Sequence, residues 1–232
     1  DSYDAFHLAG PYLDGLREGR YSESGLDDKV RRVLRLIFRT TMSGRTDFGS
    51  FASPEHFRMS RDVAQEGIVL LKNENRALPL DLPSVKRILV VGDNATARHC
   101  WGGGSMGVKT KSEITPLEGI LTLVGDKAEV DFVRGYRPVG NGLESDDAVE
   151  LREEAVGVAK KADIVLFFGG HNRWAHQDCE GMDRVSYELP YSQNQLIEAL
   201  GRVTDRLVVT LVSGSAVSMP WLDSADAVLY GW

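Results

Sequence analysis

The residues of this chain that could do chemistry gather in one short segment, residues 171–184. The segment contains three acidic residues, two histidines, two arginines and a tryptophan. Carboxylates beside an aromatic ring and polar donors suit carbohydrate chemistry, because one carboxyl can act as general acid and base while the ring stacks on a sugar. The alternative is a solvated loop whose charges pair with one another, in which Asp183 and Arg184 are structural.

Metal binding is the second chemistry that this segment could carry. Its metal-ligating residue types are His171, His176, Asp178 and Cys179. They follow one another along a single loop without any standard zinc-ligand spacing, so we expect no metal here.

A glycine-rich run forms a second unusual segment, which reads Cys-Trp-Gly-Gly-Gly-Ser over residues 100–105. Glycines let the backbone approach a ligand closely and reach positive φ, so the run could form a backbone cradle. Nucleotide binding is disfavoured, because the Gly-x-Gly-x-x-Gly fingerprint is not met and no Gly-Lys-Ser/Thr follows. A flexible surface loop is the alternative.

Strands that alternate with helices must position these two segments. Short apolar runs predict strands over Ile88–Val91, Ala128–Val133, Ile164–Phe168, Leu207–Val212 and Ala227–Tyr230. Helices are predicted over Pro116–Leu123, Asp147–Lys161 and Ser192–Val203. This alternation predicts an α/β fold: an open, doubly wound, mostly parallel sheet of about five strands with helices on both faces. In such a sheet the working loops follow the carboxyl ends of the strands, and both unusual segments lie in such loops.

The residues before this sheet are predicted to form helices and a linker. The apolar residues Val30, Val33, Leu34, Ile37 and Phe38 fall on one face of a helix. A second helix is predicted over Pro54–Lys72, with Ser53 as its N-cap and a proline at its first position. Residues 41–53 are rich in glycine, serine and threonine and predict a linker between the two helices.

The composition excludes several classes of protein. The chain has 232 residues, of which 42% are hydrophobic and 26% are charged, as in ordinary globular proteins. Its formal net charge of −7 disfavours nucleic acid, whose phosphates need a basic face. The apolar runs are strand-sized and far shorter than the roughly 20 residues of a membrane span. We therefore expect neither nucleic acid nor a membrane as a partner.

Several motifs, in one consistent order, resemble glycoside hydrolase family 3. Residues 25–36 read Gly-Leu-Asp-Asp-Lys-Val-Arg-Arg-Val-Leu-Arg-Leu, and residues 64–75 read Ala-Gln-Glu-Gly-Ile-Val-Leu-Leu-Lys-Asn-Glu-Asn. The order continues with Leu78–Leu80, Lys86–Ala95, Gly102–Ser105, Glu180–Arg184, Leu189-Pro190 and Ser213-Gly214. The resemblance covers almost the whole chain, and the ordered set is far more specific than any one motif.

The resemblance implies a retaining, exo-acting β-glycosidase, with β-glucosidase as the first expectation and β-xylosidase as the second. Such an enzyme removes terminal non-reducing sugars from oligosaccharides or β-glycosides. Its aspartate nucleophile lies on an N-terminal (β/α)8 barrel and its glutamate acid/base on a second, α/β sandwich domain. The resemblance implies neither a metal nor an organic cofactor.

The resemblance also implies a division of the chain. Residues 1–45 are expected to be the helical tail of the barrel, residues 46–82 a linker and connecting helix, and residues 83–232 the α/β sandwich domain, truncated at its C-terminal end. No residues here match the family's nucleophile motif. The chain alone is therefore expected to be inactive and to need the barrel of the same enzyme as its partner.

Two residues are candidates for the acid/base. The family's loop commonly reads Glu-x-Glu-Gly-x-Asp-Arg, whereas residues 178–184 read Asp-Cys-Glu-Gly-Met-Asp-Arg. Glu180 matches the second glutamate and is the first candidate. Asp178 replaces the first glutamate and is the second candidate, although its shorter side chain needs the backbone closer to the leaving oxygen. The expected sugar contacts are Trp101, Gly103, Ser105, His171, Trp174 and His176.

Several alternatives stay open at this point. The chain could be a non-catalytic carbohydrate-binding fragment, which the missing nucleophile motif supports, or a flavodoxin-like nucleotide-binding module. Cys100 and Cys179, one in each long loop, could form a disulfide or remain free thiols. The location is also open, with a secreted or periplasmic protein favoured over a cytoplasmic one.

Overall fold

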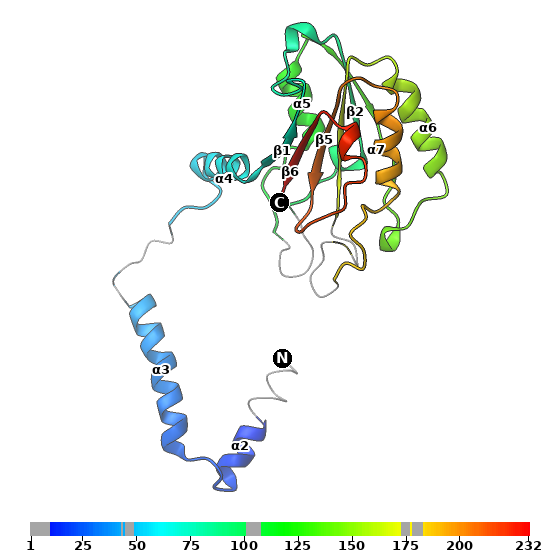
Figure 1. Ribbon diagram of the computed structural model, residues 1–232. Coiled ribbons are helices and arrows are strands. Elements are labelled where there is room, and N and C mark those ends of the chain that lie inside the picture. The colour runs from blue at the N-terminus through cyan, green and yellow to red at the C-terminus, as the bar shows by residue number, and fades with distance from the viewer. Residues whose placement is uncertain (1–9, 43, 45–48, 101–107, 173–176, 178–182) are drawn as a thin grey trace. The chain divides into compact units, whose positions relative to one another are not determined.

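The computed structural model of the chain describes residues 10–42, 44, 49–100, 108–172, 177 and 183–232 (Figure 1). The chain divides into two compact units, Asp1–Phe51 and Ala52–Trp232. The first unit contains helices α2 (Gly10–Arg17) and α3 (Glu23–Thr41). The second unit contains the sheet, so the chemistry-bearing segments belong to it.

Helix α3 is an amphipathic helix with a capped start. The Ser22 hydroxyl accepts a hydrogen bond from the amide of Gly25 at 3.2 Å. Aspartates pair with arginines one turn later, Asp27 with Arg31 and Asp28 with Arg32. The apolar face predicted from the sequence is present, and in the described part of the chain it is exposed; its members are Val30, Val33, Leu34, Ile37 and Phe38.

The second unit is built on a six-stranded sheet. Its strands are β1 (Val69–Asn73), β2 (Arg87–Val91), β3 (Glu129–Val133), β4 (Ile164–Gly170), β5 (Leu207–Val212) and β6 (Ala227–Gly231). They lie in the order β1-β6-β5-β4-β2-β3. Strand β1 is antiparallel to β6, and every other neighbouring pair is parallel. The predicted open, mostly parallel sheet is confirmed, with β1 added to the five predicted strands.

Helix α4 (Pro54–Gly67) begins where the sequence predicts but ends earlier. Ser53 and His56 form a capping box at its start. After Gly67 the chain forms β1, which pairs with β6 from Val69 opposite Tyr230 to Asn73 opposite Ala227. The prediction of a helix as far as Lys72 is wrong, because the apolar run at 68–71 fits helical spacing but satisfies its backbone groups through the neighbouring strand.

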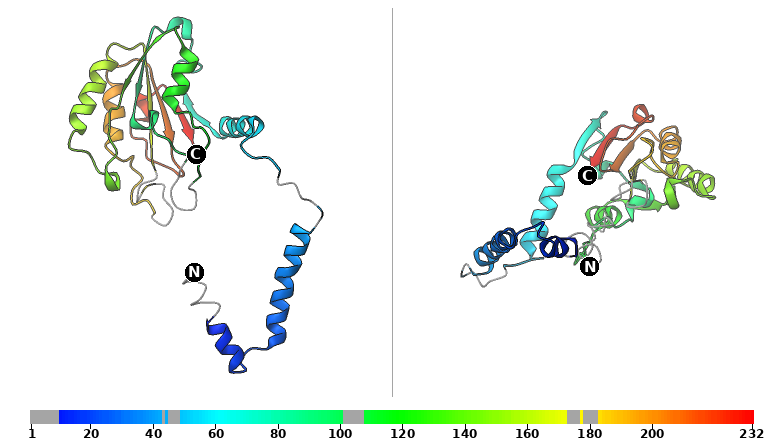
Figure 2. Two further views of the ribbon diagram at one scale, coloured as in Figure 1. Left: turned by 180° about the vertical axis from the view of Figure 1, so that it is seen from behind. Right: turned by 90° about the horizontal axis from the view of Figure 1, so that it is seen from below.

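Helices cover both faces of the sheet (Figures 1 and 2). Helices α6 (Ala148–Ala159) and α7 (Gln193–Gly201) lie on one face, and α5 (Pro116–Val124) lies on the other. The side chains of β2 point alternately into two hydrophobic cores, because successive side chains of a strand point to opposite faces of the sheet. Leu89 and Val91 belong to the core with α6 and α7, whereas Ile88 and Val90 belong to the core with α5.

Asp163 joins the amino ends of β2 and β4 through hydrogen bonds to backbone amides. Its carboxylate accepts hydrogen bonds from the amides of Lys86 at 2.7 Å and Arg87 at 2.9 Å. The amides of Arg87 and Lys86 lower the pKa of Asp163, since they stabilise its charged form.

We expect Asp163→Asn to lower the free energy of unfolding at neutral pH. Because the pKa is lower in the folded state, the stabilisation is present above the unfolded-state pKa of about 4 and is lost as the pH falls through the folded-state value. Urea unfolding at pH 7 and pH 3 measures the difference, with Asp126→Asn in an exposed turn as the control. A difference that stays constant between the two pH values would contradict the prediction.

Candidate functional site

The strand order places the starting points of the two long polar loops side by side. Val91 of β2 pairs with Phe167 of β4, so the loops after these neighbouring strands leave the same edge of the sheet. The chain order also reverses here, because β3 lies on one side of β2 while β4, β5 and β6 follow on the other. Ligands of open α/β sheets bind at such a switch point, outside the carboxyl ends of the strands. The candidate site therefore lies at the carboxyl edge of β2 and β4.

Each of these two strands runs into a glycine that no other residue could replace without strain. Gly92 has a φ of +119°, and Gly170 has a φ of +115°. A Cβ atom on Gly92 would lie 1.9 Å from the carbonyl oxygen of Phe168, and one on Gly170 would lie 2.0 Å from that of Val212. The glycines thus allow backbone to approach backbone at the switch point.

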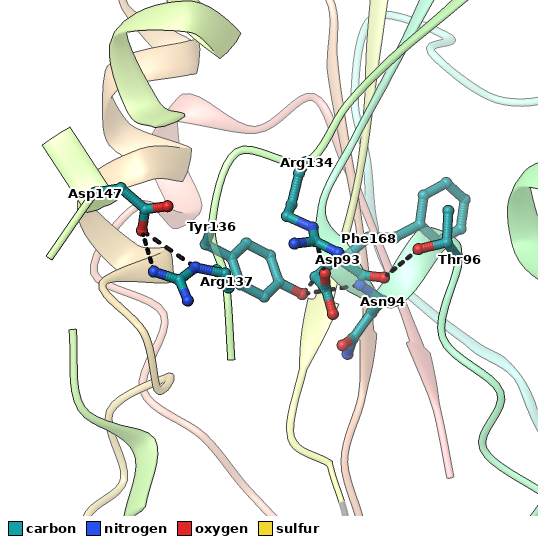
Figure 3. A network of polar contacts seen from close by, with 8 residues as sticks. All are labelled: Asp93, Asn94, Thr96, Arg134, Tyr136, Arg137, Asp147 and Phe168. Atoms are coloured by element: carbon teal, nitrogen blue, oxygen red, sulfur yellow. Dashed lines mark hydrogen bonds and ion pairs between the residues drawn. The ribbon is translucent and has the colours of Figure 1, made fainter. Parts of the chain in front are cut away.

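Tyr136 ties the ends of β2 and β4 together (Figure 3). Its side chain is buried, and its hydroxyl accepts a hydrogen bond from the amide of Asn94 and donates one to the carbonyl oxygen of Phe168, both at 3.2 Å. Burial raises the pKa of Tyr136 well above its ordinary value. The hydroxyl therefore keeps the proton that it donates to Phe168.

A partly buried carboxylate lies beside this tyrosine (Figure 3). Asp93 follows β2 after a single residue, Gly92, and its Oδ1 lies 2.8 Å from Nε of Arg134, which follows β3. Burial raises the pKa of Asp93, although the positive charges of Arg134 and His99 oppose the shift. Asp93 was not among the residues predicted for the site, although its position just after a buried strand was the available signal.

A second tyrosine holds the base of the loop after β4. The Tyr191 hydroxyl accepts hydrogen bonds from Nδ2 of Asn172, at 2.9 Å, and from Nε2 of Gln177. The Gln177 carbonyl oxygen in turn accepts from the amide of Asn172 at 3.1 Å. The rings of Tyr191 and Tyr136 are stacked, with centroids 6.2 Å apart. Both loops are therefore anchored to one pair of stacked rings.

His171, an expected sugar contact, is buried where β4 ends. Its side chain is 3% exposed, and its Nδ1 lies 3.0 Å from the hydroxyl of Ser213, which follows β5. The Arg184 guanidinium lies 3.3 Å from Nε2 of the same ring. Arg184 also donates to the Ser215 hydroxyl and to the carbonyl oxygen of Ala216. These contacts join the loops that follow β4 and β5.

A cavity of about 410 Å³ opens beside this junction. Its lining offers a guanidinium, a carboxylate, hydroxyl groups and a phenol ring, from the residues Asp183, Arg184, Val185, Ser186, Tyr187, Ser215 and Ala216. The cavity thus combines several hydrogen-bonding groups with an aromatic ring, as ligand sites do.

Most of the predicted site residues lie outside the described residues. They are Glu180, Asp178, Trp101, Gly103, Ser105, Trp174 and His176. Cys179 lies outside them as well, whereas Cys100 is an exposed, free cysteine. The amide of Cys100 donates to the carboxylate of Glu113 at 3.0 Å, at the base of the glycine-rich run.

Metal sites and membrane-spanning helices can be examined only among the residues whose positions are described. In that part of the chain, histidine, cysteine, aspartate and glutamate form no group of three or more that could hold a metal ion. None of the helices described is both long and apolar enough to cross a membrane.

Gln193 is a structural support of the site that the sequence did not reveal. It is fully buried at the start of α7, and its side-chain amide pairs with both backbone groups of Gly170, at 2.8 and 2.9 Å. We expect Gln193→Leu to lower the free energy of unfolding by about 2–4 kcal/mol, because it leaves two buried backbone groups unsatisfied.

Urea unfolding of Gln193→Leu, with Gln195→Leu as the control, tests this expectation. Gln195 lies on the same helix but is exposed, so its replacement by another good helix former changes little. Equal effects of the two substitutions would show that the bonds to Gly170 contribute nothing measurable.

Fold and site together define a class of protein: an open α/β domain whose polar loops meet at a topological switch point. The sequence model of the glycosyl hydrolase family 3 C-terminal domain matches residues 68–232. The chain therefore belongs to glycoside hydrolase family 3 and contains its C-terminal α/β domain.

Relatives with known names support this assignment. The chain is 45% identical to β-glucosidase BoGH3A of Bacteroides ovatus, over 99% of this chain and 32% of that protein. It is 33% identical to thermostable β-glucosidase B of Acetivibrio thermocellus, over 94% of this chain and 28% of that protein. The crystal structure of a β-glucosidase from Bifidobacterium adolescentis superposes with a TM-score of 0.78 at 30% identity, over 94% of this chain and 31% of that one. The chain thus spans about a third of the length of these relatives.

Proposed function

We propose that this chain carries the acid/base loop of a retaining, exo-acting β-glycosidase, a β-glucosidase first and a β-xylosidase second. The observation that carries the proposal is the position of the acidic loop. It follows β4 at the switch point, in a chain that is 45% identical over almost its whole length to a protein named β-glucosidase. The proposed substrates are terminal non-reducing sugars of oligosaccharides or β-glycosides.

The rest of the active site is proposed to come from an N-terminal (β/α)8 barrel of the same enzyme. Two facts support this partner: the chain spans about a third of its relatives, and no motif for the nucleophile occurs in it. In this proposal residues 1–45 form the helical tail of the barrel, residues 46–82 form a linker and connecting helix, and residues 83–232 form the α/β sandwich domain. Strand β1, within the connecting segment, completes the sheet.

The proposed reaction has two steps. A barrel carboxylate attacks the anomeric carbon while the bond to the leaving oxygen breaks, and Glu180 gives its proton to that oxygen. Water then attacks the glycosyl-enzyme, and Glu180 takes back a proton as the nucleophile is released. Asp178 is the second candidate for this role. The proposed sugar contacts remain Trp101, Gly103, Ser105, His171, Trp174 and His176, and the mechanism uses no metal or organic cofactor.

A denaturing mass spectrum combined with an assay tests this function. A polypeptide much larger than 25.6 kDa, or a second chain bearing the barrel, should accompany hydrolysis of aryl β-glucosides with retention at the anomeric carbon. Hydrolysis of aryl β-xylosides in the same assay ranks the two sugars. A single 25.6 kDa species that binds sugar, hydrolyses nothing and is not rescued by added barrel would favour the carbohydrate-binding fragment.

A further inference from the structure

We propose that Tyr191 and Gln177 are positioning residues for the general acid: the Tyr191 hydroxyl holds the Gln177 side chain, and Gln177 fixes the start of the acidic segment. Gln177 directly precedes Asp178 in the sequence and lies three positions before Glu180. The inference rests on the function proposed above. It assigns a role in catalysis to two residues that would not touch the sugar.

The burial of Gln177 is the first observation. A glutamine in a polar loop is ordinarily exposed, yet this side chain is 4% exposed. Its carbonyl oxygen accepts from the amide of Asn172, and its amide nitrogen donates to the Tyr191 hydroxyl. Both polar ends of the Gln177 side chain are therefore hydrogen-bonded, which restrains Gln177 relative to Asn172 and Tyr191.

The backbone of Tyr191 is the second observation. Tyr191 and Ser192 have φ values of +60° and +57°, a left-handed conformation that residues with side chains adopt rarely and only where the surrounding structure holds them. The Tyr191 amide donates to the carbonyl oxygen of Gly142 at 3.1 Å, and its ring packs on Tyr136. The turn and the ring thus have their own supports, so the hydroxyl is available to hold the loop.

The hydrogen bonds of Tyr191 and Gln177 should affect catalysis, because proton transfer depends on the position of the general acid. A general acid must lie within hydrogen-bonding distance of the leaving oxygen, and a displacement of about 1 Å lowers the rate by up to roughly 100-fold. Removing the Tyr191 hydroxyl frees Gln177, so it should weaken protonation of the leaving group. Attack by the barrel nucleophile should stay intact, because that residue lies on another domain.

The test is Tyr191→Phe in the intact protein, which removes the hydroxyl and keeps the ring. We expect kcat for methyl β-glucoside, a poor leaving group, to fall roughly 10-fold or more, and kcat for 2,4-dinitrophenyl β-glucoside, which needs little protonation, to change less than about 3-fold. Tyr230→Phe is the matched control, because it also removes a buried tyrosine hydroxyl, one bonded to the carbonyl oxygen of Ser215. The control should leave the ratio of the two rates unchanged.

A second variant and the wild type separate the outcomes. Gln177→Ala should reproduce the selective loss, and it decides the question alone if Tyr191→Phe does not fold. Equal losses on both substrates, or no loss on either, would overturn the positioning role while the proposed function stands. A wild-type protein that hydrolyses neither glucoside would overturn both.

Discussion

Glu180→Gln in the intact protein is expected to lower kcat for a glucoside with a poor leaving group by roughly 10²–10⁴-fold, the usual contribution of a general acid. Glutamine keeps the shape of the side chain but has no acidic proton to transfer to the leaving oxygen. The loss should shrink for aryl glucosides with good leaving groups, because their oxygen departs without protonation. Steady-state kinetics over a series of aryl and alkyl glucosides measures this dependence on the leaving group.

Asp178→Asn serves as the comparison for Glu180→Gln, because each of the two residues is a candidate acid. The variant that lacks the true acid should also lose the basic limb of its pH–rate profile, since that limb reports ionisation of the acid. An unchanged rate of Glu180→Gln on the poor leaving group would eliminate Glu180. The same selective loss in Asp178→Asn would then assign the role to Asp178.

Gly170→Ala is expected to lower the free energy of unfolding of the α/β unit by about 3–5 kcal/mol. The added Cβ would lie 2.0 Å from the carbonyl oxygen of Val212, and the φ of +115° is one that alanine adopts only under strain. Backbone cannot move aside as a flexible side chain can, so the end of β4 must shift away from β5. Urea unfolding of the intact protein measures the effect.

Gly157→Ala is the control for this substitution and should act in the opposite direction. Gly157 lies within α6, and a Cβ there would meet nothing within 4 Å. Alanine should therefore raise stability by about 0.5–1 kcal/mol through its helix propensity. A loss below about 1 kcal/mol in Gly170→Ala would show that the edge of the sheet yields more easily than its contacts indicate.

The central strands could be predicted because they are buried on both faces. Predicted strands Leu207–Val212 and Ala227–Tyr230 match β5 and β6 within one residue, since continuous apolar runs bounded by turn formers specify them locally. Strand β1 could not be predicted this way, because it lies at the sheet edge and its residues are largely exposed. Its pairing with β6 is a tertiary interaction; Gly67 followed by the β-branched Ile68 and Val69 was the local signal.

The residues of the site also differ in whether their local sequence could have revealed them. Ser213 directly follows a buried strand and Asp93 follows one after a single glycine, so the rule that working loops follow strand ends could have found them. Tyr136, Tyr191 and Gln193 act through hydrogen bonds to segments that are distant in sequence, and nothing in their local sequence indicates those partners. His171 was selected for its residue type, but the structure gives it buried contacts to Ser213 and Arg184.

The direction of β1 has a consequence for assembly. Because β1 is antiparallel to β6, its first residue lies opposite Tyr230, near the carboxyl end of that strand. The polypeptide that leads into the sheet therefore arrives at the edge from which the loops after β2 and β4 leave. On the proposed function, a barrel joined upstream would be tethered at that edge, and a short tether gives an effective concentration in the millimolar range. The two halves of the active site would then meet as an intramolecular encounter, independent of how dilute the enzyme is.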